Sequence, residues 1–283
     1  MTQRALPIWQ VDAFASEPFK GNPAAVCVLD RYPDDRWLQN LAIEMNLSET
    51  AFVVPMETPG NFHLRWFTPA AEVDLCGHAT LASAHTLIEQ NVVSPNAPIR
   101  FQTRSGELTC HQSGDHITLD FPAIPVTGTA DETLAKDVRS ALGIETAQVM
   151  TSKFDLLVII DAESTVRGLK PDFHRLSMIP VRGVIVSAVS DDASIDFVSR
   201  FFAPQHNIDE DPVTGSAHCC LTPYWSEKLD KTSLVGYQAS SRGGTVYCEL
   251  NRSSQHGDSE SGDRVKLSGS AVTVMEGSLK VSF

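Results

Sequence analysis

Short runs in which apolar and polar residues alternate dominate the chain and predict many β-strands. Alternation with a period of two residues is typical of a strand with one buried face, and glycine-containing turns separate several of the runs. In the first half of the chain the predicted strands are residues 8–14, 24–29, 51–54, 62–67, 99–103, 107–111 and 117–121. In the second half they are residues 153–160, 183–189, 196–202, 244–251, 264–268, 271–276 and 278–283.

Five segments repeat their apolar residues at helical spacing and predict α-helices. They are residues 34–46, 77–90, 130–142, 169–178 and 215–229. Gly143 follows the third segment and suits a left-handed helix stop. Pro223 lies inside the fifth segment, where it removes one backbone hydrogen bond, so we expect it to kink or split that helix.

An internal repeat connects residues 65–79 with residues 200–217. Five residues match without a gap: Arg65, Phe67, Pro69, Val73 and Asp74 correspond to Arg200, Phe202, Pro204, Ile208 and Asp209. After three additional residues in the second copy, Gly77-His78-Ala79 corresponds to Gly215-Ser216-Ala217. Two copies of one strand–loop–helix unit predict an α+β protein with two similar lobes and a cleft between them. We place the N-terminal lobe at residues 1–123 plus about 278–283 and the C-terminal lobe at residues 124–277, with the proline-rich stretch 121–125 as the linker.

Composition and charge narrow the function classes. The chain has 283 residues, 42% of them apolar and 20% charged, which is enough for two lobes with separate cores. Its net charge of −13 argues against a nucleic-acid partner, because phosphate binding needs clustered basic residues. The longest apolar run, residues 156–160, is far below the ~20 residues of a membrane span. No signal peptide is visible, so we expect a cytoplasmic protein that does not bind membranes.

The cysteines predict neither disulfides nor a metal site. Six are scattered along the chain and no pair has the C-x-x-C spacing, so we expect no metal and treat five of them as small buried residues. Cys76 stands apart because it immediately precedes a predicted helix, where a thiol pKa can be lowered.

The starts of the two matched helices are candidate binding elements. A helix N-terminus carries unpaired N–H groups and partial positive charge, and Gly77 and Gly215 let a ligand approach the backbone closely. Two such helix starts facing a cleft would hold a carboxylate and stabilise negative charge beside it, which suits proton abstraction. Glu49, between a helix and an apolar strand, is either a surface carboxylate or a partly buried general base.

Four motifs together give a specific family resemblance. They are Phe19-Lys-Gly-Asn-Pro-Ala-Ala-Val26, Asn46-Leu-Ser-Glu-Thr-Ala-Phe-Val53, Asp74-Leu-Cys-Gly-His-Ala-Thr-Leu81 and Asp211-Pro-Val-Thr-Gly-Ser-Ala-His218. In this order they resemble the PhzF (phenazine biosynthesis protein-like) family of isomerases over essentially the whole chain. The resemblance implies the diaminopimelate epimerase-like fold: two β-barrel-like lobes, each around a central helix, with the active site between them. It also implies a homodimer.

The resemblance implies a reaction as well. The best-characterised reaction of the family is the isomerisation of a dihydro-hydroxyanthranilate, in which a proton moves between carbons without a metal or an organic cofactor. The resemblance carries over this class of mechanism but not the substrate, which would be a small carboxylate. By motif, Glu49 would be the acid/base, while His78 and Asp211 would position the substrate and assist proton movement. The backbone at Gly77 and the Ser216 hydroxyl would bind the carboxylate, and Asn22 would shape the pocket wall. Taken singly, His78, Asp211, Ser216 and Asn22 are also ordinary helix-start, cap and turn residues.

Related racemases and epimerases suggest an alternative. In those enzymes a cysteine precedes the glycine in each repeat, and the two thiols act on opposite faces of the substrate. Here Cys76 fills the first position, whereas Thr214 fills the second. This mismatch favours Glu49 as the base, with Cys76 as a candidate thiol participant. The alternatives are an amino-acid racemase or epimerase that uses Cys76 and a binding protein that has lost turnover.

Overall fold

The computed structural model describes residues 5–253 and 262–280 and divides into two compact units. Unit 1 comprises residues 1–120 and 268–283, and unit 2 comprises residues 121–267. The segment that returns to unit 1 begins at Ser268, whereas the sequence placed its start at about residue 278. The reason is that the last strand pairs along its whole length with the first, from Ala271 opposite Ala13 to Leu279 opposite Leu6. The predicted strand end at residues 281–283 lies outside the described residues.

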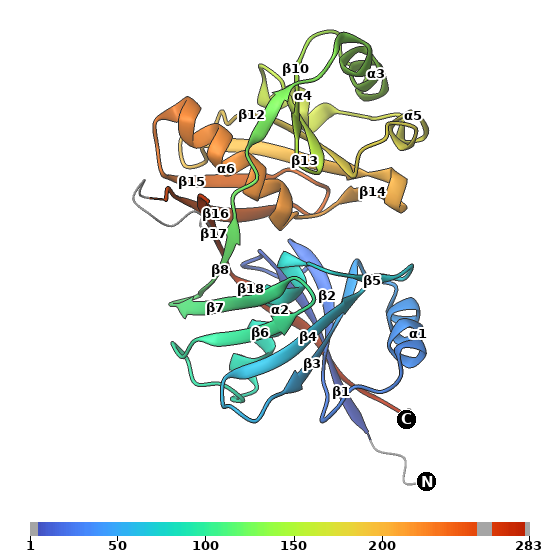
Figure 1. Cartoon of the computed structure of the whole chain (residues 1–283), viewed down its shortest axis with the longest axis vertical. Helices are drawn as coiled ribbons and strands as arrows, with labels where there is room; N and C mark the ends of the chain where they lie inside the picture. Colours follow the sequence, from blue (N-terminus) through green and yellow to red (C-terminus); the bar gives the residue numbers. More distant parts are fainter. Residues whose placement is uncertain (1–4, 254–261, 281–283) are drawn as a thin grey trace. The chain divides into compact units, whose positions relative to one another are not determined.

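Unit 1 is built on a sheet that folds around one helix (Figure 1). Its strands are β1 (Leu6–Ala13), β2 (Asn22–Val28), β3 (Glu49–Pro55), β4 (Asn61–Phe67), β5 (Glu72–Val73), β6 (Ile99–Thr103), β7 (Gly106–Ser113), β8 (His116–Pro122) and β18 (Ala271–Leu279). They pair in the order β18-β1-β2-β3-β4-β6-β7-β8, and β5 adds to β4. The β2–β3 and β4–β6 pairs are parallel and the others are antiparallel.

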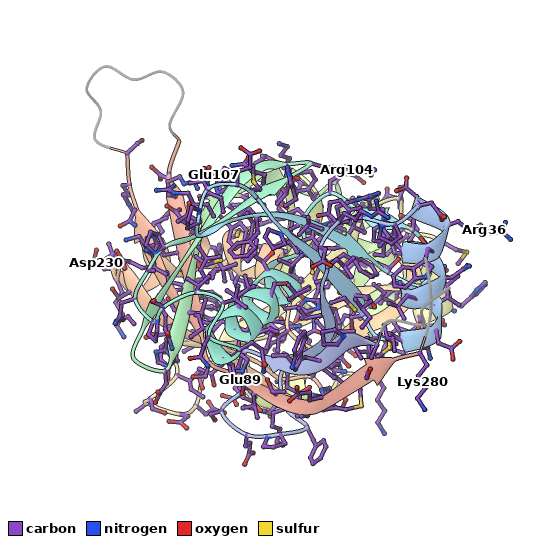
Figure 2. All side chains as sticks on the ribbon, turned by 90° about the horizontal axis from the view of Figure 1, so that it is seen from below. Arg36, Glu89, Arg104, Glu107, Asp230 and Lys280 are labelled. Carbon is purple, nitrogen blue, oxygen red and sulfur yellow. The ribbon has the colours of Figure 1, made fainter. Side chains whose placement is uncertain are left out.

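The central helix of unit 1 is α2 (Gly77–Glu89). Nine of its thirteen residues are buried, so it is enclosed on nearly every side, as the central helix of a curved sheet should be. It contacts β1, β2, β3 and β18. The amphipathic helix α1 (Asp35–Met45) packs against β3 and β4, and its Leu38 and Leu41 share a core cluster with Phe52. Charged side chains such as Arg36, Glu89 and Arg104 extend outward (Figure 2).

Unit 2 repeats this strand order. Its strands are β9 (Val126–Thr129), β10 (Gln148–Ser152), β11 (Asp155–Ile159), β12 (Gly183–Val189), β13 (Phe197–Ala203), β14 (Ile208–Asp211), β15 (Ser233–Gln238), β16 (Gly244–Asn251) and β17 (Arg264–Gly269). The pairing runs β9-β10-β11-β12-β13-β15-β16, with β14 added to β13. The parallel pairs, β11–β12 and β13–β15, correspond to β2–β3 and β4–β6.

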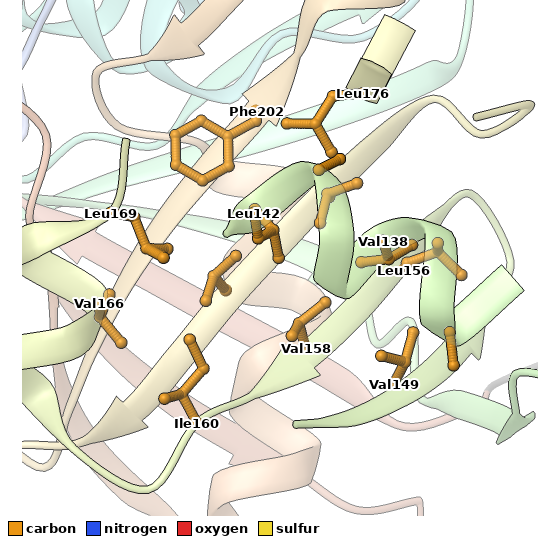
Figure 3. Close-up of a cluster of buried hydrophobic side chains, with 14 of the residues drawn as sticks. Val138, Leu142, Val149, Leu156, Val158, Ile160, Val166, Leu169, Leu176 and Phe202 are labelled. Atoms are coloured by element: carbon orange, nitrogen blue, oxygen red, sulfur yellow. The ribbon is translucent and has the colours of Figure 1, made fainter. Parts of the chain in front are cut away.

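Helices cover the sheet of unit 2 in the way that α1 covers that of unit 1. The covering helices are α3 (Glu132–Leu142), α4 (Glu163–Gly168) and α5 (Phe173–Ser177), with a 3₁₀ turn at Pro204–His206, whereas α6 (Gly215–Leu229) is the counterpart of α2. A core cluster that includes Val138, Val166, Leu176 and Phe202 joins α3, α4 and α5 to the strands (Figure 3). The central helix α6 has nine buried residues and contacts β15 and β16.

The structure corrects three local predictions. The helix predicted at residues 169–178 is shortened to α5, and α4 precedes it in a segment for which no helix was predicted. The strand predicted at residues 153–160 begins only at Asp155, as β11. Pro223 does not split α6, which runs unbroken from Gly215 to Leu229. The Cys219 carbonyl, which a proline four residues later cannot engage, accepts instead from the Ile124 N–H at 2.9 Å.

Other local predictions are confirmed. Gly143 ends α3 with a φ of 70°, in the left-handed region expected of a glycine stop. The predicted helices at 34–46, 77–90, 130–142 and 215–229 correspond to α1, α2, α3 and α6. Within the part of the chain that the structure describes, we find no helix with the length and apolarity to cross a membrane.

Candidate active site

The edge of the unit 1 sheet where β2 and β3 begin carries two polar residues. The two strands are parallel with Ala24 opposite Glu49, so their N-terminal ends meet at one edge. Glu49 is the first residue of β3 and follows α1, which ends at Asn46 in the left-handed conformation. Asn22 is the first residue of β2 and is fully buried. Gly21 allows the turn before it, because a Cβ at this position would lie 2.1 Å from the Ala13 carbonyl oxygen.

The first turn of α2 brings two more groups to this edge. His78 Nε2 lies 2.9 Å from Glu49 Oε2, and the two side chains are only 6% and 12% exposed. On the other side of the ring, Asn22 Nδ2 lies 3.1 Å from His78 Nδ1. Cys76, which caps α2 with extended backbone, places Sγ 3.6 Å from the same Nδ1. We call Asn22, Glu49, Cys76 and His78 the unit 1 cluster.

Burial and neighbouring charge set the protonation of this cluster. Burial on its own lowers the pKa of His78, but its contacts with Cys76 and with the Glu49 carboxylate favour the imidazolium and hold this pKa well above its ordinary value. Burial, with a smaller contribution from Glu49, raises the pKa of the Cys76 thiol to about 11. The helix N-terminus was expected to lower this pKa; desolvation outweighs it, so at neutral pH the sulfur is a thiol rather than a thiolate.

The unit 1 cluster also contains a set of atoms that could ligate a metal. One ligand atom each from Glu49, Cys76 and His78 lies within 4.8 Å of the others. Cys, His and carboxylate groups are zinc ligands by type. The first turn of α2, however, carries partial positive charge and favours an anion over a cation. The geometry therefore fits proton transfer between the carboxylate and the imidazole better than a resident metal.

The loop before α6 in unit 2 holds the predicted residue Asp211. Its carboxylate accepts a hydrogen bond from the Thr214 hydroxyl. Gln238, which is fully buried on β15, holds the same loop through two hydrogen bonds. Its Oε1 accepts from the Thr214 N–H at 2.8 Å, and its Nε2 donates to the Asp211 carbonyl at 2.6 Å. The sequence missed Gln238 because β15 was not among the predicted strands and no motif covers it.

The first turn of α6 carries Gly215 and Ser216, with a charged pair beside them. Arg182 Nη2 donates to Ser216 Oγ at 3.0 Å. Arg182 also donates two hydrogen bonds, from Nε and Nη2, to the carboxylate of Asp155, which is 2% exposed. Sequence reasoning missed both partners because neither lies in one of the four motifs. Their proximity depends on the parallel pairing of β11 with β12, which puts Asp155 opposite Gly183.

Comparison with known proteins identifies the family of the chain. The family model described as phenazine biosynthesis-like protein matches residues 11–277. The chain belongs to this family. It is 49% identical over 273 residues to an uncharacterized isomerase of Halalkalibacterium halodurans, which covers 96% of this chain and 98% of that protein. These findings confirm the resemblance and make this phenazine biosynthesis-like protein an enzyme of the isomerase type.

Solved structures support the fold of this phenazine biosynthesis-like protein. A PhzF-family protein of Enterococcus faecalis matches with a TM-score of 0.88 and 41% identity, covering 98% of this chain and 99% of that one. A probable proline racemase from Agrobacterium radiobacter matches with a TM-score of 0.64 at 11% identity, covering 97% and 92% of the two chains. The second likeness is one of fold alone. Both agree with a mixed α/β chain that has extensive sheet and few helices.

The predicted site residues of this phenazine biosynthesis-like protein therefore form two groups. Asn22, Glu49, Cys76 and His78 are in contact in unit 1, with Gly77 between the last two along α2. In unit 2, Asp211 precedes α6, and Gly215 and Ser216 form its first turn. Arg182, Asp155 and Gln238 are polar residues at these places that the sequence did not single out.

Proposed function

We propose that this protein is a cofactor-independent isomerase that moves a proton between carbons of a small carboxylate-bearing metabolite. Glu49 is the acid/base that removes the proton and returns it. The observation that carries the proposal is the buried contact between Glu49 Oε2 and His78 Nε2 at 2.9 Å. A carboxylate paired with an imidazole can accept a proton and exchange it within one enclosed cluster.

The surrounding residues take the supporting roles. The raised pKa of His78 favours an imidazolium whose Nε2 lies 2.9 Å from Oε2 of Glu49. Asn22 lies against the other side of the ring, with Nδ2 3.1 Å from Nδ1. The first turns of α2 and α6, at Gly77 and at Gly215-Ser216, bind the substrate carboxylate, because unpaired N–H groups there favour anions.

Further parts of the proposal rest on the sequence. Asp211 assists proton movement, as the family motif suggests. The protein works as a cytoplasmic homodimer, without nucleic acid or membrane as partner.

Solvent exchange tests the proposal. The enzyme is incubated in D₂O with a dihydro-hydroxyanthranilate and a panel of amino acids, and deuterium incorporation is followed by mass spectrometry. We expect Glu49→Gln to lower incorporation by about 10³-fold, because the amide cannot accept the proton. Ligand binding, measured by calorimetry, should change little, since the amide keeps the size of the side chain.

The control is Glu107→Gln, which changes an exposed carboxylate in the same unit. This variant should exchange like the wild type. Unchanged exchange in Glu49→Gln would remove Glu49 from the chemistry. A wild-type protein that binds the carboxylates without exchanging any proton would be a binding protein and would contradict the proposal.

A further inference from the structure

Strand pairing identifies the position in unit 2 that corresponds to Glu49. In unit 1 the second residue of β3 lies opposite Phe67, and in unit 2 the second residue of β12 lies opposite Phe202. Phe67 and Phe202 are matched members of the internal repeat. The first residues of the two strands, Glu49 and Gly183, are therefore equivalent.

The same equivalence relates two side-chain pairs. Glu49 contacts His78, the second residue of α2, at the start of β3. Arg182, immediately before β12, donates to Ser216, the second residue of α6. His78 and Ser216 are matched in the repeat. Where unit 1 has a carboxylate and an imidazole, unit 2 has a guanidinium and a hydroxyl, both of which can donate hydrogen bonds to an anion.

Arg182 is held in one orientation by its own surroundings. Nε donates to Asp155 Oδ1 at 2.9 Å and Nη2 to Oδ2, which is the two-point geometry that fixes a guanidinium plane. The Asp155 side chain is 2% exposed and that of Arg182 is 37% exposed, so the pair is buried on its carboxylate side. The rings of Phe154 and Phe201 lie 5.2 and 5.9 Å from the guanidinium carbon and confine it further.

The bond from Arg182 also determines what Ser216 can do. A guanidinium has only donors, so Ser216 Oγ must be the acceptor of the 3.0 Å hydrogen bond. The hydroxyl proton of Ser216 is consequently directed to a different acceptor. We propose that Arg182 is a positioning residue that orients the Ser216 hydroxyl to donate to the substrate carboxylate. This inference rests on the proposed function, in which Ser216 binds that carboxylate.

A pair of probes that differ only in charge tests the inference. Calorimetry compares anthranilate with 2-aminobenzamide, which replaces the carboxylate by a neutral amide. The wild type should bind anthranilate more tightly than the amide. Arg182→Met should weaken anthranilate binding by about tenfold, the size expected for one charge-assisted hydrogen-bond network, and should change amide binding little.

A double-variant cycle separates positioning from direct contact. If Arg182 acts through Ser216, then Ser216→Ala should remove the same discrimination, and Arg182→Met should add no more than about twofold to it. Additive losses would mean that Arg182 binds the carboxylate itself, and an Arg182→Met variant that binds anthranilate like the wild type would also overturn the inference. A wild type that does not prefer anthranilate to its amide would overturn it as well.

Separate control variants distinguish a loss of binding from a loss of folding or of catalysis. Because Arg182→Met leaves Asp155 buried without its partner, the measurement is repeated with Arg182→Met and Asp155→Asn combined, which removes both charges. Arg175→Met, an exposed arginine of the same unit, should bind like the wild type. Loss of exchange in Glu49→Gln with unchanged anthranilate binding in Arg182→Met would reject only this inference. Carboxylate discrimination without proton exchange would reject the proposed isomerase and leave the role of Arg182 standing.

Discussion

The two units place different chemistry on the same frame. In unit 1 the start of β3 and the first turn of α2 carry a carboxylate and an imidazole in contact. In unit 2, β12 begins with a glycine, and the residue before it carries a guanidinium. This guanidinium donates to a hydroxyl in the first turn of α6. The repeat has kept the backbone that brings a strand start to a helix start. Which reaction each unit serves depends on a few side chains placed there.

The two arginines of the repeat show what has been kept. Arg65 donates to Glu72 through Nε and Nη2, each at 2.7 Å. Arg200 donates to Glu210 in the same way, at 2.7 and 2.9 Å. Glu72 and Glu210 do not match in the sequence alignment of the repeats. Both units therefore fix the loop before the central helix with a two-point arginine–carboxylate pair, although they draw the carboxylate from different positions.

The largest expected difference between the units concerns their buried helix histidines. Burial lowers the pKa of His218 to about 4, from an ordinary value of 6.5, whereas His78 in unit 1 is shifted upward. The folded state thus resists protonation of His218, and the stability this gives is complete above pH 6.5 and is lost as the pH falls towards 4. The shift of the His218 pKa from 6.5 to about 4 corresponds to about 3 kcal/mol of unfolding free energy.

Unfolding by urea at several pH values measures this effect. We expect His218→Gln to flatten the fall in unfolding free energy between about pH 6.5 and 4, because a glutamine binds no proton there. The control, His206→Gln, removes an exposed imidazole from the same unit and should leave the profile unchanged. If the unfolding free energy falls equally with pH in both variants, His218 is not the group whose protonation causes the fall.

A second, smaller effect concerns the position equivalent to Glu49. A Cβ on Gly183 would lie 2.3 Å from Cζ of Phe201, so unit 2 has no room for a carboxylate there. We expect Gly183→Ala to lower the unfolding free energy by about 2 kcal/mol through overpacking, as measured by urea titration. Gly128→Ala is the matched control, because its Cβ would lie 3.7 Å from the nearest atom, Thr151 Oγ1.

Removing the Phe201 ring tests whether its clash with a Cβ at position 183 causes this loss of stability. Phe201→Leu removes the ring, so Gly183→Ala should cost clearly less in that background than alone. Equal costs in the two backgrounds would mean that the ring is not what excludes a side chain. The difference between the units at this position would then reflect the history of the repeat rather than its packing.

Much of this frame could be predicted from the sequence. The match of Phe67 with Phe202 and of Gly77 with Gly215 predicted two strand–loop–helix units, and helices begin at both glycines. The family resemblance assigned Asn22, Glu49 and His78 to one site, and in the structure His78 contacts both of the others.

The polar network of unit 2 could not be predicted in this way. Arg182 and Ser216 are 34 positions apart, and Arg182 and Asp155 are 27 apart. Their contact depends on the parallel register of β11 and β12, which alternation of apolar and polar residues does not specify. Pro223 was misjudged for a similar reason: the group that satisfies the freed Cys219 carbonyl is Ile124, on a distant segment.

The smallest expected effect concerns the mismatch of Cys76 with Thr214. The pKa of the Cys76 thiol is about 11, so little thiolate is present at neutral pH, and the matched position offers no second thiol. We expect Cys76→Ser to keep proton exchange in D₂O within about tenfold of the wild type, comparable to the loss of a weak polar contact with His78. Cys110→Ser, a buried cysteine elsewhere in unit 1, serves as control. The contrary result would be a loss of proton exchange near that of Glu49→Gln, together with alkylation of Cys76 that anthranilate prevents. It would assign the proton transfer to the sulfur, and the chemistry of the two units would then differ less than their side chains indicate.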